Sequence, residues 1–324
     1  MEENIEQRVD LTLFSEKIQE LKDQIASVIV GQEQTVDLVL AAILANGHVL
    51  IEGVPGVAKT LLARLTARLI DADFSRIQFT PDLMPSDVLG TTVFNMKTND
   101  FDFHQGPIFA DIVLVDEINR APAKTQAALF EVMEGRQISI DGITHKMGEL
   151  YTILATQNPV EQEGTYKLPE AQLDRFLMKI TMDYPSLEEE VDILERHHTN
   201  TSLIRLDDIK PAITKEELLS LRAFMNQVFV DRTLLQYIAL IVQQTRTSKA
   251  VYLGASPRAS VAMLQASKAY ALLQGRDFVT PEDIKFVAPY VLQHRLILTA
   301  EAEMEGYSPV KVTQRLIDKV EVPK

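Results

Sequence analysis

The sequence predicts an α/β fold in which a largely parallel, five-stranded sheet is covered by helices and followed by an all-helical second domain. Two observations predict it. Five short apolar runs are mostly separated by helix-patterned stretches, which is typical of parallel sheets. After Pro185 the strand patterns stop and only helical patterns remain. At roughly 150 residues per domain, a chain of 324 residues is long enough for about two domains.

The elements of the first domain follow from the spacing of apolar residues. Apolar side chains recur at helical spacing over residues 18–28, behind Ser15, and again over residues 36–44, so two amphipathic helices are expected before the sheet. The strands are expected at residues 48–52, 76–79, 112–116, 151–156 and 176–182.

Two connections between these strands carry the pattern of an inserted β-hairpin, in which two extended segments flank a turn. The segments and their turns are residues 91–94 and 101–104 around 98–100, and residues 137–140 and 144–147 around Asp141 and Gly142.

The second domain is expected to contain helices only. Thr214 and Glu217 form a capping box, and Ser-Pro and Thr-Pro pairs at 256–257 and 280–281 are typical helix starts. Pro289 should end or kink the helix that begins at Thr280. We therefore expect a nucleotide-binding core over residues 1–198 and a helical domain over residues 199–324, with a linker at 199–211.

The composition and the charge exclude several classes of function. No cysteine occurs, which removes disulfides, cysteine zinc sites and thiol catalysis and suits a reducing compartment. The net charge of −14 repels a polyphosphate backbone, so general nucleic-acid binding is disfavoured. The longest apolar run, residues 38–45, is far shorter than the roughly 20 residues that span a bilayer. Residues 1–10 are acidic, unlike a signal peptide. We expect a cytoplasmic protein without a membrane span.

The strongest functional pattern lies directly after the first strand and directly before a helix, and consists of Gly53, Val54, Pro55, Gly56, Val57, Ala58, Lys59 and Thr60. Backbone N–H groups of such a loop can surround nucleotide phosphates, Lys59 adds positive charge, and the Thr60 hydroxyl can ligate Mg²⁺. The strict motif has glycine in place of Ala58, whose Cβ crowds the approach of phosphate. A plain Gly/Pro turn is the alternative, but the order of strand, loop and helix favours a phosphate loop.

The third predicted strand ends in two adjacent carboxylates, Asp116 and Glu117. Beside a phosphate loop, Asp116 can hold Mg²⁺ through its water shell and Glu117 can orient or deprotonate the attacking water. The alternative is a buried strand that ends in solvated acids. The histidines show no repeated metal-ligand spacing, so Mg²⁺ carried with the nucleotide is the only metal expected.

Three further residues complete the candidate site. Asn158 follows the fourth strand, where a neutral amide can hold a water without competing for Mg²⁺, although asparagine before proline is also a common turn residue. Arg175 precedes the fifth strand, and Arg258 lies near the N-terminus of a helix, where a cation is unfavourable. Both arginines suggest a phosphate, with surface or interdomain ion pairs as the alternative.

Taken in order, these motifs resemble those of the AAA+ ATPases, from about residue 30 to the end of the second domain. Within that class the chain resembles the MoxR family, on the strength of GVPGVAKT (53–60), GPIFA (106–110), NRAPAKTQAALFEVMEGRQ (119–137) and NPVEQEGTYKLPEAQLDRF (158–176). Alanine before the lysine is usual in this family, which removes the objection to Ala58. The hairpins resemble the helix-2 insert and the pre-sensor hairpin of the clade that also includes the magnesium chelatase ATPase subunit.

The resemblance implies a P-loop NTPase core with a helical lid, ATP and Mg²⁺ as cofactors, and a ring that is usually hexameric. By resemblance, Lys59 and Thr60 bind phosphate and Mg²⁺, Asp116 and Glu117 are the acidic pair, Asn158 is the first sensor, Arg175 the arginine finger and Arg258 the second sensor. MoxR proteins are thought to be chaperones that mature enzyme complexes or insert their metal cofactors, commonly with a partner that carries a von Willebrand factor A domain.

Three functions remain open from the sequence: an ATP-hydrolysing remodelling chaperone, a chelatase-like ATPase subunit, and an ATP-dependent assembly scaffold. GPIFA and the stretch before Arg175 favour the first over the second, and Glu117 weighs against a scaffold, which needs no water-activating acid. At least one hairpin is expected to contact a client or partner protein. Its anchors would be Phe94, Met96, Phe101 and Phe103, unless these side chains pack into the core.

Overall fold

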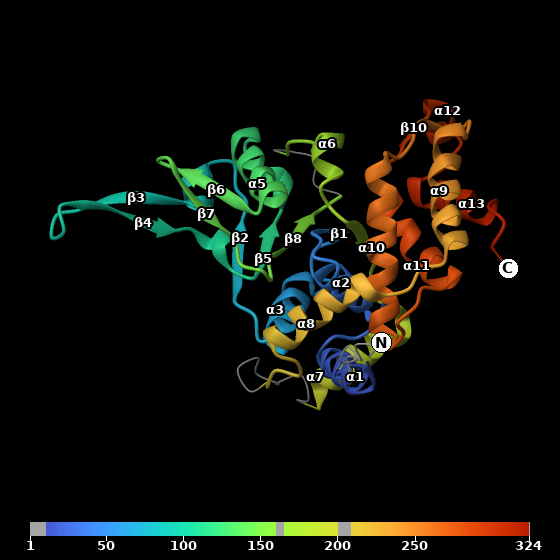
Figure 1. Ribbon diagram of the computed structural model, residues 1–324, viewed down its shortest axis with the longest axis horizontal. Coiled ribbons are helices and arrows are strands. Elements are labelled where there is room, and N and C mark those ends of the chain that lie inside the picture. Colours follow the sequence, from blue (N-terminus) through green and yellow to red (C-terminus); the bar gives the residue numbers. More distant parts are fainter. Residues whose placement is uncertain (1–10, 160–164, 200–208, 324) are drawn as a thin grey trace, which may run out of the picture.

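Five parallel strands form the central sheet of the computed structural model, which describes residues 11–159, 165–199 and 209–323 (Figure 1). The strand order is β2-β5-β8-β1-β9, and all five predicted strands are confirmed. Their bounds are β1 (Val49–Gly53), β2 (Phe74–Gln78), β5 (Ile112–Asp116), β8 (Thr152–Gln157) and β9 (Met178–Met182).

Both faces of the sheet are covered, as β5 illustrates. Ile112 and Leu114 join one hydrophobic core, whereas Val113 and Val115 join a second core on the opposite face. Successive side chains of a strand alternate between faces, so a strand buried on both faces is an uninterrupted apolar run. This burial explains why the strand is so easily found in the sequence.

Helices α1 and α2 precede the sheet, as predicted, and pack with α3 in the first core. The second face is covered chiefly by α5. The helices of this part of the chain are α1 (Leu11–Val28), α2 (Glu33–Leu44), α3 (Lys59–Leu69), α4 (Pro85–Leu89), α5 (Ala123–Gly135), α6 (Glu170–Leu173) and α7 (Leu187–His198). The first helix begins before Ser15, because Leu11 and Phe14 also pack against the core.

Both predicted hairpins are confirmed as antiparallel pairs: β3 (Gly90–Asn95) with β4 (Asp100–Gln105), and β6 (Gln137–Ile140) with β7 (Ile143–Lys146). The β3–β4 hairpin projects far from the body of the molecule (Figure 1). At its base the rings of Phe103 and His145 lie 4.2 Å apart, so the two hairpins touch each other. Gly90 has a φ of +102°, and a Cβ there would lie 2.2 Å from the His104 carbonyl oxygen, so the hairpin requires glycine at its start.

The C-terminal part is a helical lid, with one correction to the prediction. Strand β10 (Val251–Leu253) pairs antiparallel with β11 (Ile297–Leu298), so the lid is not all-helical. These strands are too short to show a periodic pattern, and they form because Leu298 is buried with the last helices. The lid helices are α8 (Lys215–Phe224), α9 (Arg232–Thr247), α10 (Pro257–Leu273), α11 (Pro281–Leu292), α12 (Ala300–Met304) and α13 (Pro309–Asp318).

The lid packs on the core, since α10 and α2 contribute to one continuous hydrophobic cluster. Pro289 does not end α11, which continues to Leu292 because Val291 and Leu292 are fully buried. Most of the predicted linker lies outside the described residues, so the division after residue 198 stays a prediction. Among the described helices, none combines the length and the apolar character needed to cross a membrane.

Candidate active site

The candidate phosphate loop connects β1 to α3, in the order that the motif requires. Lys59 is the first residue of α3, and its ammonium donates a hydrogen bond to the Gly53 carbonyl oxygen at 2.6 Å. Ala58 has φ 60° and ψ 21°, the left-handed conformation that costs an L-residue roughly 1–2 kcal/mol. The usual glycine at this position therefore has a backbone reason, besides the access of phosphate that the sequence suggested.

The carboxyl ends of three neighbouring strands bring the core candidates together. Strand β8 lies between β1 and β5, and its register pairs Glu52 with Gln157 and Val115 with Ala155. The phosphate loop, Asn158 and the acidic pair Asp116 and Glu117 consequently leave the sheet at the same edge. Ligands of open parallel sheets bind at this edge. Asn158 is buried, and because it follows β8 it lies between the other two groups.

Thr156 fixes both acidic residues and was missed in the sequence. Its hydroxyl donates to Asp116 Oδ1 at 3.0 Å and accepts from the backbone N–H of Glu117 at 3.0 Å. That N–H belongs to a residue with φ 57°, a left-handed conformation that is uncommon for non-glycine residues and that the Thr156 hydrogen bond helps to hold. The sequence signal that could have identified Thr156 is its position just before Asn158, at the end of the same strand.

Two side chains of the neighbouring strand β2 bind the two carboxylates. Arg76 Nε lies 2.7 Å from Asp116 Oδ2, while Gln78 donates to Glu117 Oε2 at 2.9 Å. Arg120 also pairs with Glu117 at 3.0 Å. These partners, too, were missed, because an arginine or glutamine on a strand carries no motif of its own.

The donors present fit Mg²⁺ that arrives with a nucleotide. Thr60 offers a hydroxyl and Asp116 a carboxylate, the oxygen ligands that Mg²⁺ prefers, and the ion usually keeps several waters and binds substrate phosphates. Within the described residues, no group of three or more histidines and acids could hold a metal alone. The buried His48 bonds to backbone groups instead.

The two arginines lie at the opposite edge of the sheet. Leu177, directly before β9, donates its N–H to the carbonyl oxygen of His48, directly before β1. Arg175 is therefore beside the amino end of β1, whereas the phosphate loop follows its carboxyl end. Four residue steps at about 3.3 Å give a separation of about 13 Å along the strand alone. The chain does not bring these two arginines to its own phosphate loop.

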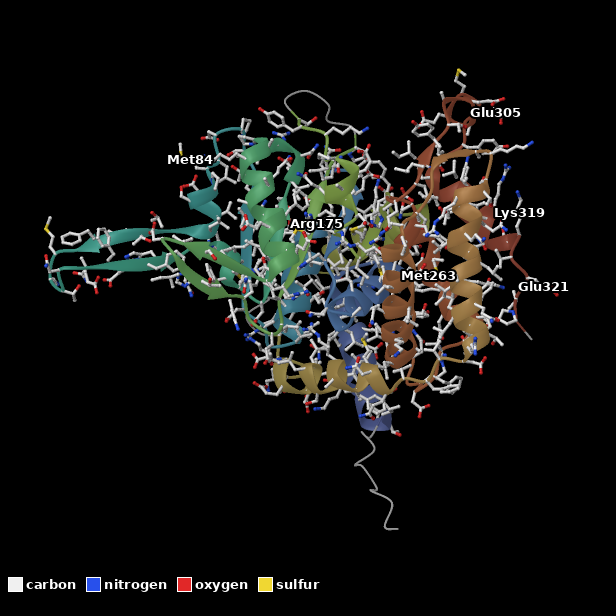
Figure 2. The ribbon with its side chains drawn as sticks, turned by 45° about the horizontal axis from the view of Figure 1, so that its top comes forward. Met84, Arg175, Met263, Glu305, Lys319 and Glu321 are labelled. Carbon is white, nitrogen blue, oxygen red and sulfur yellow. The ribbon has the colours of Figure 1, made fainter. Side chains whose placement is uncertain are left out.

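Arg175 and Arg258 instead meet at Glu134, in the last turn of α5. Figure 2 shows Arg175 between α5 and α10. Arg258, the second residue of α10, lies 3.2 Å from Glu134 and 3.7 Å from Asp174. The ion pairs that were the alternative to a phosphate role for these arginines therefore exist, and they join the core to the lid. Part of the segment before Arg175, residues 160–164, lies outside the described residues.

Comparison with known proteins gives this arrangement a family. The model of the ATPase family associated with various cellular activities (AAA) matches residues 48–178, and that of the AAA lid domain matches residues 243–318. A protein from Cytophaga hutchinsonii, assigned as an ATPase, has a crystal structure that superposes with a TM-score of 0.88 at 40% identity, over 97% of each chain.

Two curated relatives extend over nearly the whole chain. The Bacillus subtilis protein YeaC, uncharacterized, is 48% identical over 93% of both chains. Chaperone MoxR1 of Mycobacterium tuberculosis is 44% identical over 93% of this chain and 81% of its own. The chain belongs to the MoxR family of AAA+ ATPases. It is accordingly an ATPase with a nucleotide-binding core and a lid, and membership of this family suggests oligomeric assembly.

Proposed function

We propose that this MoxR-family ATPase is a remodelling chaperone whose active sites are shared between neighbouring subunits of a ring. The observation that carries the proposal is the division of the site within one chain. The phosphate loop and the acidic pair lie at one edge of the sheet, and Arg175 and Arg258 lie at the other. A second subunit can supply the missing half.

At the phosphate-loop edge, each residue has one proposed role. Lys59 and the loop N–H groups bind the phosphates, and Asn158 holds the attacking water in place. Glu117 accepts a proton from that water, since its carboxylate lies at the phosphate-loop edge and is partly exposed. Thr60 and Asp116 would hold Mg²⁺, which neutralises charge on the phosphates when it is bound.

At the opposite edge, Arg175 and Arg258 act on the ATP of the adjacent subunit. An arginine finger provided in this way contributes about 10³ to 10⁵ in rate in well-studied phosphoryl transfer. A closed ring, which we expect to be hexameric, gives every phosphate loop one such neighbour. Hydrolysis then depends on assembly.

The output of hydrolysis is proposed to be the remodelling, maturation or metal-cofactor insertion of a client enzyme complex, together with a von Willebrand factor A partner. The Mycobacterium tuberculosis relative, which is 44% identical, is named a chaperone. The β3–β4 hairpin offers a contact surface, since Met96 is 89% and Phe101 67% exposed. The core-packing alternative is thus wrong for these side chains, although Phe103 does pack on Phe109.

A chelatase-like ATPase subunit and an ATP-dependent scaffold remain the alternatives to this proposal, and both are less favoured than a chaperone. The cytoplasm stays the expected compartment, because a chain without cysteine suits a reducing environment.

Mixing two inactive variants tests the shared site. Arg175→Ala subunits keep the phosphate loop, and Lys59→Ala subunits keep the arginines, so each variant alone should lose at least about 100-fold of its ATP turnover. A mixture should regain part of it, because some interfaces join an intact loop to an intact finger. Phosphate release at constant total protein measures the effect. If the variants assemble normally and no mixture of them shows turnover, Arg175 does not act between subunits.

A further inference from the structure

Glu134 is placed between two arginines that come from different parts of the fold. Arg175 belongs to the segment before β9, and Arg258 to the start of the lid helix α10. Glu134 Oε2 pairs with Arg175, and Glu134 Oε1 lies 3.2 Å from Arg258. Each carboxylate oxygen thus binds one guanidinium, and this single side chain links the core arginine to the lid arginine.

A second ion pair fixes the segment that carries Arg175. Arg295 is 3% exposed, and its Nε lies 2.7 Å from Asp174 Oδ1, next in sequence to Arg175. The same guanidinium donates to the carbonyl oxygens of Phe176 and Leu177. Asp174 is therefore already committed to Arg295, and its 3.7 Å separation from Arg258 is too long for a hydrogen bond.

The charges of the surrounding side chains explain why Glu134 is needed to keep Arg175 and Arg258 together. The cluster of Arg175, Arg258, Arg295, Asp174 and Glu134 has three cations and two anions. Without the Glu134 charge, three guanidinium groups would share one carboxylate, and like charges at short range repel. Arg258 has the freedom to move away, since its side chain is 53% exposed.

We propose that Glu134 is a positioning residue that holds Arg258 of the lid beside Arg175, so that the two arginines reach the phosphates of a neighbouring subunit's ATP as one unit. The proposal rests on the action of Arg175 between subunits that is proposed above. Paired guanidinium groups bind phosphate oxygens with more geometric control than one group does. The excess of one positive charge leaves the cluster able to accept such an anion.

Glu131 provides a matched control. It lies one turn earlier on α5 and lines the same surface cavity of about 380 Å³ as Glu134, Gln172 and Arg175. In the described part of the chain, no ion pair of Glu131 is found. Glu131→Gln therefore removes the same charge from the same helix without touching either arginine.

The test uses a mixture in which the two halves of the site come from different chains. Lys59→Ala subunits serve as finger donors and Arg175→Ala subunits as loop donors. Adding Glu134→Gln to the finger donor should lower the turnover of the mixture about 10-fold, since small misplacements of catalytic groups cost up to about 100-fold. Adding it to the loop donor should have a much smaller effect. Adding Glu131→Gln to the finger donor should also have little effect. Thermal melting and light scattering check folding and assembly.

The outcomes separate the positioning role from the shared site. A large loss that occurs only when Glu134→Gln is in the finger donor supports the proposal. A mixture that is active and equally sensitive in both donors, or insensitive in both, overturns the role of Glu134 while the shared site stands. A parent mixture without any turnover overturns both.

Discussion

Lys59 and Glu117 lie at the same edge of the sheet but are proposed to act at different steps, nucleotide binding and hydrolysis, so their loss should have different consequences. Lys59→Ala should weaken ATP binding at least about 10-fold, because it removes the positive charge at the phosphates. Glu117→Gln should keep binding and lower turnover by about 100-fold or more, since an amide cannot accept the proton. Titration with a fluorescent ATP analogue and phosphate release measure the two effects. Normal turnover by the Glu117→Gln protein would remove Glu117 from the mechanism.

Buried His48 should make stability depend on pH. Its Nδ1 accepts the Ile153 N–H at 3.0 Å, and burial, aided by nearby Arg136, lowers its pKa to about 3. Between about pH 6.5 and about pH 3, His48 therefore binds a proton in the unfolded chain but not in the folded chain. Its contribution to the free energy of unfolding is fully present above pH 6.5 and decreases as the pH is lowered through this window, by at most about 1.4 kcal/mol per pH unit. Burial shifts the pKa of His294 in the same direction.

Urea unfolding of a His48→Asn variant measures that contribution. The variant should be less stable at pH 7.5, but its free energy of unfolding should fall less steeply between pH 6.5 and 4.5 than that of the unchanged protein. The exposed His197 gives a control, since His197→Asn should leave the slope unchanged. Parallel slopes for the unchanged and the His48→Asn proteins would show that this histidine does not govern acid stability.

At the scale of elements, the β3–β4 hairpin should be dispensable for ATP chemistry and needed for client activation. Its rings of Phe94 and Phe101 lie 5.2 Å apart on a ribbon that extends away from the sheet. Replacing residues 97–100 with a short glycine-containing link should keep assembly and turnover within about two-fold, because these residues contact no part of the site. Activation of a client by the altered protein is the measurement. Full activation would exclude this hairpin as the contact surface.

A single substitution refines this test. Met96→Ser removes one exposed apolar side chain from the hairpin tip, and Met304→Ser removes a similarly exposed one from the lid. Loss of client activation only with Met96→Ser would separate a specific contact from a general loss of surface hydrophobicity.

The elements that the sequence predicted share a strong local pattern. The strand of Ile112 to Val115 is apolar on both faces, and the capping box of Thr214 and Glu217 marks a helix start that the structure confirms. The ribbon of β10 and β11 was missed because its two strands pair over 40 or more intervening residues and hold few residues each. Short pairs of this kind depend on tertiary contacts rather than on local pattern.

The same distinction explains what could be predicted of the candidate site. Phosphate loop, acidic pair and Asn158 each follow a strand, so topology alone brings them together. Nothing local in the sequence indicates that Glu134 meets Arg258, which lies 124 positions away. The sequence could associate both arginines with phosphate, but only the register of β9 against β1 shows that they lie far from the chain's own phosphate loop.

For the whole molecule, the proposal is that one chain carries two complementary halves of an active site, the phosphate loop with the acidic pair at one edge of its sheet and Arg175 with Arg258 at the other. The decisive measurement is the rate of ATP turnover per chain over a dilution series, with light scattering to record assembly. The rate should rise with protein concentration and reach a plateau when the chains are assembled, because a lone chain would lack a neighbour's arginines. A rate per chain that stays constant down to concentrations at which the protein is a monomer would contradict it.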